Sequence, residues 1–153
     1  MANRTSVKCN VDITGIHKHD GLEAEETKTS TKCVMYIEDG KYTLEYEEYM
    51  DGNGPESFKG GIATYNNITI TDSEMTIIRK GSIESGLYFK EGNEDISDYK
   101  TLYGIMKTKV NTKKYNMYLM EKGKRLIAEA QYDISVNGMS MSEAMIRVDI
   151  SII

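Results

Sequence analysis

Apolar and polar residues alternate along most of the chain in short stretches separated by turn signals, and no stretch shows the periodicity of a long helix. The clearest alternation lies near the end, where every second residue from Leu126 to Ile134 is apolar and the pattern resumes from Ala144 to Ile152. Asn137-Gly138 lies between these two stretches, and this dipeptide readily supplies the positive φ angles of a type I′ turn. The pattern therefore predicts an antiparallel β-hairpin.

The same alternation predicts about ten strands in all. Tight turns are expected at Asp39-Gly40, Asn66-Asn67, Asp72-Ser73 and Lys122-Gly123, and longer loops at Asp51–Pro55 and Glu91–Asp98. Short connections force neighbouring strands to run antiparallel. Ten such strands in a chain of 153 residues predict an all-β fold, a single antiparallel up-and-down β-barrel of about 8–10 strands that forms one domain over residues 1–153. A barrel of this size can be packed solid or can hold one small ligand.

Composition narrows the class of protein. The net charge is −5 and the hydrophobic share is 39%, as in ordinary soluble acidic proteins. Residues 1–15 lack the apolar core of a signal peptide, and no apolar run reaches the length of a membrane-spanning helix, so we expect a cytoplasmic protein without membrane contact. In that compartment Cys9 and Cys33 are expected to be thiols, with a disulfide as the minor alternative.

No group of residues has the spacing of a known catalytic, phosphate-binding or metal site. His17 and His19, expected in a polar loop, have no third histidine to complete a zinc site. We therefore expect a protein that is not an enzyme and has no cofactor or metal.

Six segments that together extend over nearly the whole chain share the pattern of one known family. They are Leu44–Glu48, Ile78–Gly81, Leu87–Phe89, Tyr99–Gly104, Val110–Thr112 and Ala130–Gly138. In these segments the chain resembles the YwiB-like family. The resemblance implies a small bacterial cytosolic protein of unassigned function with a calycin-like, that is lipocalin-like, β-barrel. The chain departs from the family at Leu102, where proline is more common. It also lacks the Gly-x-Trp motif of secreted lipocalins, since it has no tryptophan.

A candidate ligand site centres on Arg79, which shares its strand face with Met75 and Ile77. Glu48 shares a face with Leu44 and Tyr46, so both charged residues are expected to point into the barrel. In one interpretation they form a structural ion pair that fills the interior. In the other, a small amphipathic or anionic ligand binds in the interior, where Arg79 captures its carboxylate or phosphate. The residues expected around that ligand are Arg79, Glu48, Tyr46, Tyr99, Tyr103 and Tyr132.

A second candidate is the basic segment, Lys100–Arg125, which holds eight basic residues and one acidic residue, Glu121. Tyr103, Tyr115 and Tyr118 interleave with its lysines, as in surfaces on which single-stranded nucleic acid stacks. RNA or another polyanion is thus the alternative partner, and its anion-binding surface would comprise Lys107, Lys109, Lys113 and Lys114. In the alternative interpretation, the basic segment binds nothing and is simply the solvent-exposed face of a hairpin. A structural role as a homodimer, joined through exposed strand edges, is the third possibility.

Overall fold

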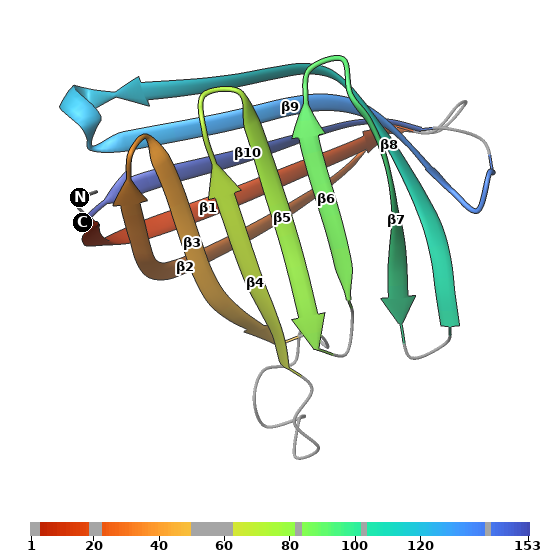
Figure 1. Cartoon of the computed structure of the whole chain (residues 1–153), viewed down its shortest axis with the longest axis horizontal. Coiled ribbons are helices and arrows are strands. Elements are labelled where there is room, and N and C mark those ends of the chain that lie inside the picture. Colours follow the sequence, from red (N-terminus) through yellow and green to blue (C-terminus); the bar gives the residue numbers. More distant parts are fainter. Residues whose placement is uncertain (1–3, 19–22, 50–62, 82–83, 102–103, 140–141) are drawn as a thin grey trace.

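Ten antiparallel strands form one continuous sheet that curls into a barrel (Figure 1). The computed structural model describes residues 4–18, 23–49, 63–81, 84–101, 104–139 and 142–153. The strands are β1 (Thr5–Lys18), β2 (Glu25–Glu38), β3 (Lys41–Tyr49), β4 (Ala63–Ile70), β5 (Glu74–Gly81), β6 (Ser85–Lys90), β7 (Glu94–Thr101), β8 (Gly104–Met120), β9 (Arg125–Val136) and β10 (Ser142–Ile152). No helix in the described part of the chain is long and apolar enough to cross a membrane.

Consecutive strands pair with each other except β6 and β7, which are the two edge strands of the sheet. In addition β1 pairs with β10, which places the start of β1 beside the end of β10 (Figure 1). Two predicted turns set the register of their hairpins: Asp39-Gly40 and Asn137-Gly138 both have positive φ at the two central residues, as a type I′ turn requires. The predicted up-and-down antiparallel barrel is confirmed.

The barrel closes along a seam between β6 and β7, the two edge strands of the sheet. Glu84 and Lys100 exchange two backbone hydrogen bonds across this seam, of 2.9 and 2.7 Å. Further along, the Ser97 hydroxyl donates to the Gly86 carbonyl at 2.8 Å. Among the described residues, the two edges thus face each other with only a few hydrogen bonds between them.

The interior is apolar in the middle and toward one end, and more polar toward the other. Leu44, Ile68, Met75 and Phe89 are fully buried in the core. At the apolar end the Tyr115 hydroxyl donates to the Thr71 carbonyl at 2.7 Å and so ties β8 to the turn between β4 and β5.

Three predictions about local structure are wrong. Asn66-Asn67 is not a turn but lies within β4, where the Asn66 amide donates to the Thr64 carbonyl and the Asn67 amide donates to Glu45. Both side-chain amides thus donate to acceptors on the sheet, although the Oδ1 of Asn66 is buried without a partner among the described residues.

The predicted loop Glu91–Asp98 is also wrong, because β7 already begins at Glu94. Its Ile96 is exposed, so the apolar alternation that marks a buried strand is missing there. Likewise His17 does not lie in a loop: it belongs to β1 and is paired with Ala144 on one side and Glu25 on the other. The predicted loop at Asp51–Pro55 lies outside the described residues.

Candidate functional site

The polar end of the barrel holds a cavity of about 290 Å³. Side chains from eight strands line it, including both edges of the seam between β6 and β7. Its apolar wall consists of Ile13, Leu87, Met106, Ile134, Val136 and Ile146. The barrel is therefore hollow at one end rather than packed solid throughout.

Arg79 enters this cavity from β5. Side chains alternate along a strand, so Arg79 points to the same side as the buried Met75 and Ile77. Its register partners are Asn66 on β4 and Ser85 on β6. The Nε atom of Arg79 is buried. Among the described residues it has no hydrogen-bond partner, and no carboxylate there forms an ion pair with this side chain. The cavity thus contains a cation whose charge the described residues leave uncompensated.

Two tyrosines stand with Arg79 in the cavity wall. Tyr132, on β9, is buried, and its ring packs on that of Phe89 with the centroids 4.8 Å apart. Burial raises the pKa of Tyr132 to about 12, against the opposing effect of the positive charge of Arg79. Its hydroxyl therefore stays protonated at neutral pH and can donate a hydrogen bond. Tyr99 lies on β7, half-buried and paired with Met106 of β8.

This arrangement suits an amphipathic anion. Arg79 can bind a carboxylate or phosphate through two parallel hydrogen bonds, and Tyr132 can donate a third. No aspartate or glutamate is found among the described residues of the wall, so nothing described there repels an anion. The apolar residues on the opposite strands would contact the uncharged part of the ligand.

Of the six residues predicted to surround a ligand, the structure brings Arg79, Tyr99 and Tyr132 into one cavity wall. Tyr46 is half-buried against the core and borders a separate hollow of about 520 Å³, beside Glu47, Tyr65 and Lys80. The side chain of Glu48 and the whole of Tyr103 lie outside the described residues.

Sequence reasoning missed other residues of the wall, notably His17 of β1 and Thr27 and Thr29 of β2. Their positions follow from the register, in which His17 is two residues beyond Gly15 and Gly15 faces Thr27. Extending the alternation of Val11 and Ile13 by two further steps would have identified His17 as an interior residue.

The lysines of the basic segment are largely neutralised by neighbouring strands. Lys107 pairs with Asp98 at 2.7 Å and Lys109 with Glu94 at 3.4 Å. Lys113 lies 3.1 Å from Asp133 and 4.0 Å from Glu143. Lys114 is exposed. The resulting surface alternates in sign instead of forming a continuous positive stripe.

The predicted stacking tyrosines of this segment are only partly on the surface. Tyr118 is exposed, but Tyr115 is buried, and burial raises its pKa. The prediction for Tyr115 is wrong because a β-bulge between Thr112 and Lys114 adds one residue to β8 and turns Tyr115 inward.

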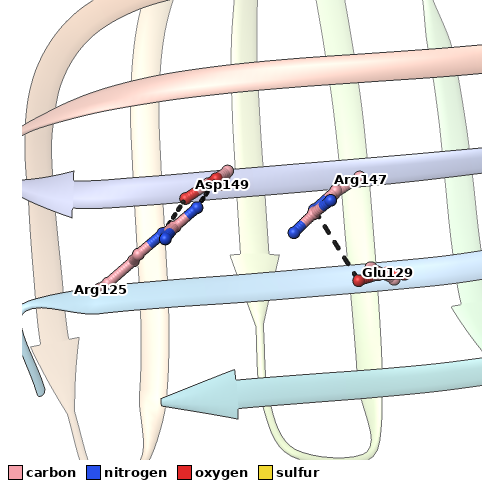
Figure 2. Close-up of polar contacts among 4 residues, drawn as sticks. All are labelled: Arg125, Glu129, Arg147 and Asp149. Atoms are coloured by element: carbon pink, nitrogen blue, oxygen red, sulfur yellow. Dashed lines mark hydrogen bonds and ion pairs between the residues drawn. The ribbon is translucent and has the colours of Figure 1, made fainter. Parts of the chain in front are cut away.

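Arg125, at the end of the basic segment, is also paired. It binds Asp149 through two hydrogen bonds, from Nε at 3.0 Å and from Nη2 at 2.7 Å, and the pair joins β9 to β10 (Figure 2). Arg147 and Glu129 form a second contact between the same strands at 3.8 Å (Figure 2). The hydrogen bonds from Arg125 lower the pKa of Asp149. These two contacts join neighbouring strands of the sheet. Among the described residues, Lys114, Lys122 and Lys124 are the basic residues of the segment that form no ion pair.

Comparison with known proteins gives a family and a fold. Residues 11–148 match the family model described as a domain of unknown function, DUF1934. Among solved structures, the ywiB protein from Bacillus subtilis superimposes with a TM-score of 0.77 at 18% sequence identity, covering 95% of this chain and 92% of that one. No curated protein matches the chain.

Proposed function

The chain belongs to the DUF1934 family, the family of YwiB-like proteins, and from this premise we propose that it is a non-enzymatic protein that binds a small amphipathic anion inside its barrel. The ligand carries a carboxylate or phosphate, which Arg79 and Tyr132 hold at the polar end. In this proposal the whole chain, residues 1–153, is one calycin-like domain acting in the cytoplasm.

The observation that carries the proposal is the uncompensated guanidinium of Arg79 in an otherwise uncharged part of the wall. The buried Nε of Arg79 is an unsatisfied donor, which costs about 1–3 kcal/mol, and an anion that accepts from this side chain offsets part of that cost. The cavity, about 290 Å³, is at the lower end of the range for small-molecule sites and corresponds to about ten water molecules. The ligand is therefore a small molecule rather than a polymer.

The two other candidate functions have less support. The lysines predicted to bind RNA are mostly engaged by Asp98, Glu94 and Asp133, which lowers the positive potential that a polyanion needs. A homodimer joined through strand edges would have to use β6 or β7, and these two edges already face each other across the seam. We therefore favour the interior site over both surfaces.

A thermal-shift titration with hexanoate tests the proposal, with hexanamide as its neutral counterpart and inorganic phosphate as a second anion. Hexanoate or phosphate is expected to raise the melting temperature of the wild type, since a ligand that binds only the folded state stabilises it. The Arg79→Met variant is expected to lose this response. Lys80→Met is the matched control, because Lys80 is the next residue, exposed on the outer face, and it should respond as the wild type does.

Three results would contradict the proposal. The first is an equal response of Arg79→Met and wild type to the anions. The second is a response to hexanamide as large as that to hexanoate. The third is no response of the wild type to either anion.

A further inference from the structure

The only two cysteines of the chain face each other on adjacent strands. Cys9 of β1 and Cys33 of β2 are direct register partners, although 24 residues separate them in sequence. Their Sγ atoms are 3.8 Å apart, and the Cys9 thiol also donates to the Cys33 carbonyl at 3.4 Å. Facing residues of an antiparallel pair have Cα atoms about 4.5–5.5 Å apart, which is within the range that a disulfide bridges.

The two thiols differ in access. Cys9 is fully buried in the core cluster, whereas Cys33 is half-buried at its margin. A small oxidant can therefore reach Cys33, and Cys9 then lies in position to attack it from within. The hydrogen bond that the two thiols share, together with burial, raises the pKa of the Cys33 thiol, so its attack on a small disulfide is slow and needs an excess of that disulfide.

We propose that Cys9 and Cys33 form a reversible covalent modification site, which a low-molecular-weight disulfide such as glutathione disulfide converts into a cross-strand disulfide. In the first step the Cys33 sulfur attacks the small disulfide, its S–S bond breaks, and one small thiolate leaves. In the second step the Cys9 sulfur attacks the Cys33 sulfur, a protein disulfide forms, and the second small thiolate leaves. The two cysteine protons pass to the two leaving groups, so two protein thiols are oxidised while one small disulfide is reduced to two thiols.

The bond would tie β1 to β2 near the start of the chain without rearranging the barrel, since the two sulfurs need to move together by only about 1.8 Å, from 3.8 Å to about 2.0 Å. The closed loop also restricts the unfolded chain. The oxidised protein is therefore expected to melt at a temperature higher by roughly 5–10 °C.

The test is to incubate the purified full-length protein with excess glutathione disulfide, alkylate the remaining thiols with N-ethylmaleimide, and measure the intact mass and the non-reduced peptides. The expected product takes up no maleimide, contains a peptide linked through Cys9 and Cys33, is monomeric, melts higher, and reverts to the dithiol with dithiothreitol. Uptake of two maleimides, a lasting glutathione adduct on the wild type, or a disulfide between two chains would each overturn the proposal.

The variants separate the two steps. Cys9→Ala leaves Cys33 without its internal partner, so the glutathione adduct on Cys33 should persist instead of resolving. Cys33→Ser leaves only the buried Cys9, which should take up no glutathione. Rapid glutathionylation of Cys33→Ser would overturn the order of the steps, and the measurements on the wild type decide the proposal even if a variant fails to fold.

Discussion

Replacing Arg79 by methionine is expected to make the ligand-free protein more stable. The buried Nε of Arg79 has no described partner, and a buried donor left unsatisfied costs about 1–3 kcal/mol. Methionine retains a flexible apolar stem that can pack beside Ile77 and Leu87. Because the rest of the guanidinium faces the cavity, where water can reach it, we expect the lower part of that range, a gain of about 1–2 kcal/mol in the free energy of unfolding.

The assay is urea unfolding of the dialysed protein, followed by circular dichroism and fitted with a common m-value for both proteins. A gain of this size corresponds to a melting temperature higher by about 3–6 °C in a domain of this length. Lys80→Met, on the exposed side of the same strand, should change the free energy of unfolding by less than about 0.5 kcal/mol.

The opposite sign would refute the reasoning. If Arg79 belongs to a buried ion pair that fills the barrel, with Glu48 as the partner expected from the sequence, removing it leaves an unpaired carboxylate. Such a change destabilises a protein by about 3–5 kcal/mol. The sign of one free-energy difference thus separates a binding site from a structural plug.

Four further outcomes are expected. Tyr132→Phe keeps the ring contact with Phe89 and should change the unfolding free energy by less than about 1 kcal/mol in urea, while calorimetric titration shows a several-fold loss of anion affinity. Gly15→Val should abolish the ligand-induced thermal shift, because even a Cβ at Gly15 meets the Thr27 hydroxyl at 3.0 Å in the cavity wall. Gly138→Val should cost about 1–2 kcal/mol in urea unfolding, since this residue of the last hairpin turn has φ 71°. Finally, the pKa of the Asp149 carboxyl is lower in the folded than in the unfolded chain, where it is about 3.9, so the ionised carboxylate stabilises the folded state at higher pH. This stabilisation is lost as the pH falls through the folded-state pKa. In unfolding curves measured at decreasing pH, the stability difference between wild type and Asp149→Asn should therefore vanish.

The fold could be predicted from the sequence because its signals are local. Alternation marks the faces of each strand, and dipeptides such as Asn137-Gly138 fix the turns between them. The errors arise where tertiary contacts override local preference. Asn66 lies within a strand because its amide finds a backbone carbonyl there, and Tyr115 turns inward because of a bulge that no sequence rule locates.

The site could be predicted only in part. The alternation of side chains along one strand is enough to predict that Arg79 points inward. In the structure Tyr99 and Tyr132 lie in the same cavity wall as Arg79. Which strands surround the polar end depends on the closure of the barrel between β6 and β7, a contact between distant surfaces rather than a property of either strand. The place of Thr29 in the wall therefore does not follow from the sequence, whereas that of His17 follows from the alternation along β1.

Native mass spectrometry of the freshly purified protein, before and after extraction with organic solvent, tests the central claim most directly. The wild type is expected to carry one small anion that extraction removes, and the Arg79→Met variant, purified in parallel, is expected to have the mass of the bare chain. A bare wild type, or the same bound mass on both proteins, would contradict the assignment of the cavity as an anion site held by Arg79.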